Sequence, residues 1–256
     1  MTKHDTLNEY GWLIAKGVFS EEEIKEIREI TLSEKNKSHK GDLLSNPNLF
    51  HVISDARILD LARECLSNDE ILYFGDSTYT IDTVGNGFHK DCRRRDDPTN
   101  PDYSDKDYSL IRMGIYLQDH SQHSGGLCLR SKSHTTHSLN KGKIINVRSN
   151  VGDVIVWKLT TSHAANATVI SLFPDIGFHP VIARRAFPNF MKQKKIKPRS
   201  ALFMAFGLND RHFQPYMDFI EGTYAKKLWD NSNYSTEQMA AMTSKNVIVQ
   251  KAGQNS

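Results

Sequence analysis

The sequence predicts a mainly β fold, an antiparallel sandwich or barrel, with helices before and after it in the chain. Five segments between residues 71 and 206 have the composition of strands, and clusters of Gly, Asn, Asp and Ser separate them. The connections between these segments are too short for repeated crossover helices, which argues against a parallel α/β sheet. Both ends of the chain have helical composition, so we expect a β core with flanking helices.

The elements follow one another in a clear order. Residues 10–18 are aromatic and apolar, which predicts a short first strand. A helix is expected to begin at Ser20, because its hydroxyl can accept from free N–H groups and Glu23 completes an S-x-x-E capping box. A second helix is predicted near residues 55–66. The core strands are predicted at 71–83, 110–117, 126–129, 151–157 and 201–206, before helical composition returns at 215–242.

Composition limits the class of protein. The chain has 256 residues and no linker rich in Pro, Gly or Ser, so we assign residues 1–256 to one domain. Its 38% apolar and 25% charged residues are typical of a globular protein. The 33 basic and 30 acidic residues leave a net charge of +3, too balanced to indicate nucleic-acid binding by itself. No stretch approaches the roughly 18 apolar residues of a membrane span, and the N-terminus lacks the apolar core of a signal peptide.

The cysteines indicate a cellular compartment. There are three, an odd number, and none lies in a C-x-x-C pair: Cys65, Cys92 and Cys128. A disulfide framework is therefore not expected, and a reducing cytoplasm is the predicted location. Nothing in the sequence fixes an oligomeric state.

One short motif suggests metal chemistry. In an extended segment residues two apart project to the same side, so His89 and Asp91 can reach one point in space. An imidazole and a carboxylate supply two of the three ligands in the facial triad that holds catalytic Fe(II). Taken alone, H-x-D is a weak signal, and the alternative is a surface histidine beside a solvated aspartate. His163 follows a strongly predicted strand, where a third ligand at a barrel mouth would lie.

A candidate anion-binding residue follows. Arg199 comes directly before the strand predicted at 201–206, and a guanidinium fixed at a strand start suits bidentate binding of a carboxylate.

Several motifs in order strengthen this interpretation. The segments EYGWLIAKGVFSEEEIKEI, GFHKD, SGGLCLRSKSH and GDVIVWKLTTSHAAN occur in this order along most of the chain. Together they resemble the phytanoyl-CoA dioxygenase family of Fe(II)/2-oxoglutarate-dependent oxygenases. In this resemblance GFHKD corresponds to the first metal motif, and GDVIVWKLTTSHAAN corresponds to the strand that delivers the distal histidine.

The resemblance implies a fold, a reaction and a set of cofactors. The fold is a double-stranded β-helix, a jelly-roll, cupin-like core. His89, Asp91 and His163 would bind Fe(II), and Arg199 would hold the distal carboxylate of 2-oxoglutarate. The reaction would be hydroxylation of a small molecule, with O2 as co-substrate and with release of succinate and CO2. Related halogenases carry Gly or Ala in place of the carboxylate, so Asp91 favours hydroxylation.

The sequence also departs from the family pattern. The family's arginine usually follows the distal histidine by about ten residues, where this chain has Phe173, Pro174 and Asp175. Residues 167–198 are therefore interpreted as an insertion and a possible lid, and Arg184 and Arg185 compete with Arg199 for the 2-oxoglutarate role. Ala165 also replaces a small hydroxyl residue that touches 2-oxoglutarate in many relatives.

Other basic residues suggest how a substrate binds. Arg93, Arg94 and Arg95 follow the metal motif and either form a solvated loop with Asp96 and Asp97 or hold an anionic group of the substrate. Arg112 lies within an apolar strand. It points either outward or into the barrel, where it could contact 2-oxoglutarate or substrate. The basic run at 191–197 is either solvated or in contact with a phosphorylated substrate.

Two other functions remain open at this stage. The first is a jelly-roll protein that binds a ligand or a metal without catalysis. The second is a nucleic-acid demethylase of the same superfamily, which would carry a second arginine six residues after the first. That position is Ala205 here, so we expect a small-molecule substrate and no nucleic-acid partner.

Overall fold

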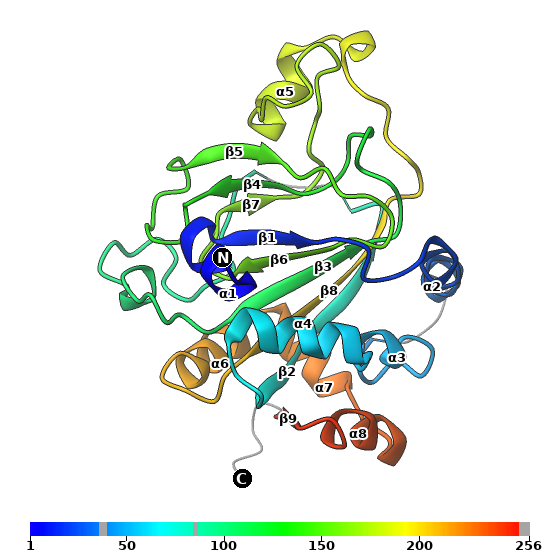
Figure 1. The fold of residues 1–256 in the computed structure, drawn as a ribbon, viewed down its shortest axis with the longest axis vertical. Helices are drawn as coiled ribbons and strands as arrows, with labels where there is room; N and C mark the ends of the chain where they lie inside the picture. The colour runs from blue at the N-terminus through cyan, green and yellow to red at the C-terminus, as the bar shows by residue number, and fades with distance from the viewer. Residues whose placement is uncertain (36–39, 84–86, 251–256) are drawn as a thin grey trace.

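The computed structural model describes residues 1–35, 40–83 and 87–250, and in these ranges the chain folds around two β-sheets (Figure 1). In the larger sheet the strands lie side by side in the order β1 (Trp12–Ala15), β6 (Val154–Lys158), β3 (Ile111–Tyr116), β8 (Ser200–Gly207), β2 (Ile71–Ile81) and β9 (Val247–Val249). The smaller sheet has the order β5 (Lys143–Asn146), β4 (Cys128–Ser131), β7 (His163–Ala164). Neighbouring strands are antiparallel, except that β9 runs parallel to β2.

The chain alternates between the two sheets. From β3 in the larger sheet it passes to β4 and β5 in the smaller sheet, returns to β6, crosses to β7 and returns again to β8. This winding defines a jelly roll, or double-stranded β-helix, and it confirms the predicted mainly β fold class. The five predicted core segments overlap β2, β3, β4, β6 and β8, whereas β5, β7 and β9 were not predicted.

Helices flank the β core. Figure 1 shows α4, α7 and α8 below the larger sheet and α5 above the smaller one. Their bounds are α1 (Lys3–Tyr10), α2 (Glu21–Glu34), α3 (Phe50–Ile53), α4 (Ala56–Leu66), α5 (Pro180–Ala186), α6 (Phe213–Glu221), α7 (Tyr224–Asn231) and α8 (Thr236–Thr243), with single 3-10 turns at Pro101–Tyr103 and Asn189–Met191. None of the helices in the described ranges is long and apolar enough to cross a membrane.

The N-terminal prediction was right in one part and wrong in another. The capping box is confirmed, because the Glu23 N–H donates to the Ser20 hydroxyl over 3.2 Å and the Ser20 N–H donates to the Glu23 carboxylate over 2.7 Å. The first strand is shorter than predicted, since Tyr10 ends helix α1 and β1 begins at Trp12. Leu7 is the one buried residue of α1, so this helix has no apolar stripe by which the sequence could reveal it.

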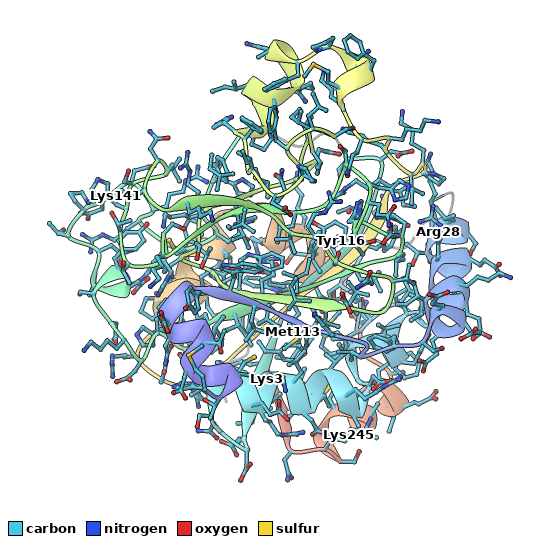
Figure 2. The ribbon with its side chains drawn as sticks, turned by 45° about the horizontal axis from the view of Figure 1, so that its top comes forward. Lys3, Arg28, Met113, Tyr116, Lys141 and Lys245 are labelled. Atoms are coloured by element: carbon cyan, nitrogen blue, oxygen red, sulfur yellow. The ribbon has the colours of Figure 1, made fainter. Side chains whose placement is uncertain are left out.

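The core has a layer on each face of the larger sheet. Met113 and Tyr116 lie three residues apart on β3 and point to opposite faces. Met113 packs in the large apolar cluster that includes α2 and α4, whereas Tyr116 packs between the sheets with Trp157 and Leu129, as Figure 2 helps to show. Burying each such side chain stabilises the fold by about 1.5–3 kcal/mol, so the sheet positions are held firmly.

A bulge in β2 sets the direction of one buried carboxylate. The pairing of β2 with β8 shifts register between Tyr73 and Ser77, and Gly75 within this bulge has a φ of 74°. A Cβ atom at Gly75 would lie 2.7 Å from the Trp229 ring, so only glycine fits this close approach. Asp76 follows directly and is buried at 2% exposure. The bulge therefore changes the direction in which the side chains of β2 point beside the candidate site.

The segment predicted as an insertion leaves the barrel between β7 and β8. It carries α5, which Figure 1 shows above the smaller sheet. Its two limbs pair with each other, since the Ser171 N–H donates to the Met191 carbonyl over 2.7 Å and the Gln193 N–H donates to the Val169 carbonyl over 2.9 Å. The base of the segment is thus closed by backbone hydrogen bonds between its own two limbs.

Candidate metal centre

Backbone pairing brings the two predicted histidine ligands together. His89 and His163 form an isolated antiparallel bridge in which the N–H of each residue donates to the carbonyl of the other, over 3.0 and 2.9 Å. Residues directly opposite in such a pair project to the same face, and the two imidazole ring centroids are 4.3 Å apart. The Asp91 N–H donates to the Leu159 carbonyl over 3.1 Å, which keeps this segment extended and turns Asp91 to the side of His89.

The three side chains converge on one point. The Asp91 carboxylate lies 3.8 Å from Nε2 of His89 and 3.5 Å from Nε2 of His163. One ligand atom from each residue lies within 4.8 Å of the others, and no other trio of His, Cys, Asp or Glu in the described ranges is this close. Ligand atoms about 2.1 Å from a common ion lie about 3 Å from their neighbours, so a small inward movement gives metal-ligand geometry.

Second contacts orient both imidazoles for metal binding. Nδ1 of His89 lies 3.2 Å from the Gly87 carbonyl, and Nδ1 of His163 lies 3.1 Å from the Thr161 carbonyl. Because a carbonyl only accepts, each Nδ1 donates its hydrogen and each Nε2 keeps its lone pair for the centre. Burial lowers the pKa of His163 to about 4, so this histidine is neutral at physiological pH.

Arg112 connects Asp91, the candidate carboxylate ligand, to the interior of the fold. Its Nε lies 3.0 Å from Oδ2 of Asp91, and its Nη2 donates to Oδ2 of Asp76 over 2.6 Å. The Tyr216 hydroxyl also donates to Asp76, over 2.8 Å. Burial acts to raise the pKa of Asp91, but the charge of Arg112, followed by those of His163 and His89, outweighs burial and lowers it. Arg112 therefore points inward and keeps Asp91 ionised and oriented.

A cavity of about 590 Å³ opens beside the three ligands. Aromatic and apolar side chains from both sheets form much of its wall, including Tyr116, Leu127, Trp157 and Phe203. Ala165 also lines it, and the threonine hydroxyls of β2 and its end, Thr78, Thr80 and Thr83, face the same space. Two buried polar atoms of this wall, Thr80 Oγ1 and Trp157 Nε1, have no hydrogen-bond partner among the described residues. Both atoms have almost no accessible surface, so they lie behind the wall and not in the open space of the cavity.

Arg199 also lines this cavity and is 4% exposed. Its guanidinium donates to the Gly125 carbonyl over 2.7 Å, to the Thr83 hydroxyl over 3.2 Å and to the Tyr116 hydroxyl over 3.4 Å. No carboxylate in the part of the chain that the structure describes forms an ion pair with it. A buried cation with neutral partners alone is costly, so the site fits an anionic ligand.

The other predicted arginines are placed differently. Arg184 and Arg185 lie on α5 and are exposed, and neither lines the central cavity. Arg93 is held by Asp102 at 3.1 Å, and Arg94 is held by Asp97. Of the three arginines after the metal motif, Arg95 alone lines the cavity, with a half-exposed side chain 3.8 Å from Asp96. The charged loop is therefore largely neutralised within itself.

A buried lysine between the two first ligands was not foreseen. Lys90 is 1% exposed and points away from the cavity, as the alternation of an extended segment requires. Its ammonium donates to the Ser133 carbonyl over 2.6 Å and to the Thr160 carbonyl, and it lies 4.9 Å from the Tyr103 ring centroid. Burial lowers its pKa to about 8. Lys90 thus fastens the ligand segment to the loops beside β4 and β6.

The fold and the cluster together define a class: a jelly-roll protein with a His-Asp-His candidate metal centre at one end of its barrel. No protein-family model matches the sequence, and no curated protein matches it. The resemblance to the phytanoyl-CoA dioxygenase family therefore stays a prediction.

Several solved structures are similar in fold. EctD from S. alaskensis, with 2-oxoglutarate and 5-hydroxyectoine, has a TM-score of 0.56 at 15% identity, over 84% of this chain and 78% of that chain. The epimerase SnoN, in complex with Fe3+, alpha ketoglutarate and nogalamycin RO, has a TM-score of 0.55 at 12% identity, over 80% and 81%. HygX from Streptomyces hygroscopicus, with nickel and 2-oxoglutarate, has a TM-score of 0.51 at 14% identity, over 80% and 85%. These likenesses establish the fold.

Proposed function

We propose that this protein is an Fe(II)- and 2-oxoglutarate-dependent dioxygenase that hydroxylates a small molecule. The observation that carries the proposal is the convergence of His89, Asp91 and His163 on one point of a cavity that the buried cation Arg199 also lines. Solved structures of similar fold contain iron or nickel together with 2-oxoglutarate, which supports the same pair of ligands here.

The three ligand residues would hold the metal on one face and leave the cavity side open. Two neutral imidazoles and one ionised carboxylate match the donor set of the facial triad. The hydrogen bonds from the Nδ1 atoms and the contact of Arg112 with Asp91 fix the ligands before metal binds. Fe(II) with 2-oxoglutarate would supply the activation of dioxygen, with succinate and CO2 as co-products.

Arg199 would bind the distal carboxylate of 2-oxoglutarate. Its guanidinium shares the cavity with the metal ligands, and its planar donors suit a carboxylate. Ala165 lines the same cavity without a hydroxyl, so it adds no hydrogen bond to 2-oxoglutarate.

The apolar walls and the half-exposed Arg95 would receive the substrate. Tyr116, Leu127 and Phe203 exclude water from the reacting carbon, and Arg95 offers a positive charge at the lining. The carboxylate ligand Asp91 favours hydroxylation over halogenation, because it fills the coordination position that a halide would need.

The test has a binding step and a turnover step. Anaerobic calorimetry should show that Fe(II) binds the wild-type chain and that 2-oxoglutarate then binds the metal-loaded protein. Aerobic incubation with a metabolite set should release succinate, and it should do so faster with the true substrate. Binding of metal without any binding of 2-oxoglutarate would instead favour a non-catalytic metal-binding barrel.

A further inference from the structure

A second, smaller cavity adjoins the central one. It has a volume of about 270 Å³ and shares two wall residues, Thr83 and Arg199, with the cavity beside the metal ligands. The remaining wall comes largely from the segment between β7 and β8, which contributes Arg184, Lys195, Ile196 and Lys197. A molecule bound here would therefore lie next to the candidate site, on the side of the insertion.

The charge of this cavity is strongly unbalanced. Four cationic side chains line it, Arg184, Lys195, Lys197 and Arg199, against one carboxylate, Asp82. An oxygen of Asp82 already accepts from the Arg199 backbone N–H over 2.9 Å. No ion pair within 4.0 Å involves Arg184, Lys195 or Lys197 among the residues that the structure describes. These cations lack a protein counter-charge.

The imbalance belongs to the insertion and not to the chain as a whole. Residues 167–198 contain six Lys or Arg residues and one Asp, although basic residues exceed acidic ones by three over the entire sequence. The rest of the chain is thus slightly acidic. A positive surface confined to one segment beside a cavity focuses an anion toward that cavity.

The cavity wall is held in place by the jelly roll. The Ser124 N–H donates to the Lys194 carbonyl over 2.9 Å, and Ser124 and Lys195 form a parallel bridge. The Lys195 stem passes over Gly125, where a Cβ atom would lie 3.8 Å from its Cγ. The Gly125 carbonyl in turn accepts from Nε of Arg199 over 2.7 Å. Lys195 and Arg199 therefore both lie against Gly125.

The electrostatics of Lys195 agree with this geometry. Burial lowers its pKa, and the neighbouring charges of Arg184 and Arg199 lower it further. The charges of Lys197 and Lys192 act in the same direction, so a bound anion would relieve the repulsion among the cations.

We propose that this cavity binds a phosphoryl group of the substrate, while the adjoining central cavity takes the part of the molecule that is oxidised. With Arg199 paired to 2-oxoglutarate, the three cations Arg184, Lys195 and Lys197 exceed the one carboxylate, Asp82, by two charges. A phosphoryl dianion balances this excess and a single carboxylate does not, and arginine with lysines is a common donor set for phosphate. The statement that the central cavity takes the oxidised part of the substrate rests on the proposed function. The statement that the smaller cavity binds an anion does not rest on it.

The direct test is calorimetric titration of inorganic phosphate into the full chain, with saturating 2-oxoglutarate and Fe(II) under anaerobic conditions. We expect the double variant Arg184→Gln/Lys195→Gln to weaken phosphate binding at least about tenfold, since each charge-assisted hydrogen bond contributes strongly. The matched control is Arg185→Gln/Lys194→Gln, which removes the same charge from adjacent positions that do not line the cavity. The control should change the phosphate Kd less than about twofold.

The outcomes separate this proposal from the proposed function. An equal loss of phosphate affinity in both double variants would mean that the segment attracts phosphate only by its general positive charge, and it would overturn the site. Absence of phosphate binding by the wild type would overturn the site as well. A raised KM for 2-oxoglutarate in Arg184→Gln/Lys195→Gln, with no change in phosphate binding, would assign the cavity to 2-oxoglutarate and also overturn it. Selective loss of phosphate binding in a protein that never releases succinate would uphold the anion site and reject the oxygenase.

Discussion

Replacing Arg112 tests how the metal centre is supported. In Arg112→Met the buried carboxylate of Asp76 loses the guanidinium beside it and keeps the hydrogen bond from the Tyr216 hydroxyl. The Asp91 carboxylate loses its contact with Nε of Arg112 at 3.0 Å. The side chains of Arg112 and Asp76 are 8% and 3% exposed, so solvent screens little of the loss. Removing one partner of such a buried pair costs about 3–5 kcal/mol of folding free energy.

The assay is urea unfolding followed by circular dichroism, with Fe(II) titration of the folded variant. Arg57→Met is the control, because Arg57 pairs with two carboxylates, Glu23 and Asp55, near the surface, and the side chains of Arg57 and Glu23 are 44% and 40% exposed. The control should cost less than about 1 kcal/mol. In the double variant Arg112→Met/Asp76→Asn, removing the stranded carboxylate should restore at least about 1.5 kcal/mol.

Fe(II) binding should also weaken in Arg112→Met, by about 10- to 100-fold, because the carboxylate ligand loses its orienting partner. Arg112→Lys keeps the charge and should fall between the wild type and Arg112→Met in both assays. The reasoning is refuted if Arg112→Met unfolds at the same urea concentration as Arg57→Met and binds Fe(II) like the wild type.

Three further predictions concern the ligands and the buried histidines. His163→Ala removes one of three ligands and should weaken Fe(II) binding at least about 100-fold, with loss of succinate release; full turnover in this variant would contradict the centre. Arg199→Gln should raise the KM for 2-oxoglutarate about 10- to 100-fold and leave the Fe(II) Kd unchanged, whereas an unchanged KM would exclude Arg199 as its carboxylate partner. Burial lowers the pKa of His120 and of His134 to about 4, from 6.5 in the unfolded chain. Between these two pH values the unfolded chain binds more protons than the folded chain. The free energy of unfolding should therefore fall as the pH falls through this range. His134→Gln should flatten the slope of this decline, measured by urea unfolding at each pH, and a slope equal to that of the wild type would contradict the assignment to His134.

The sequence by itself determined the features that depend on neighbours in the chain. Residues two apart in an extended segment share a side, so the H-x-D spacing placed His89 and Asp91 on one side of the chain, although this motif alone is a weak signal of a metal site. The capping residues Ser20 and Glu23 likewise act within one helical turn. The position of His163 after a strand predicted that it would lie at the barrel mouth, and it does lie beside His89 and Asp91.

Only the tertiary structure decided which charges are satisfied and which are left for a ligand. The position before a strand favoured Arg199, but side-chain chemistry alone does not separate it from the other arginines, because each carries the same guanidinium. Asp76, at the bulge of β2, reaches Arg112 only through the pairing of distant strands, whereas Arg199 forms no ion pair with a carboxylate of the described residues. Sheet register, a property of the whole fold, therefore decided which of these buried cations has a carboxylate partner.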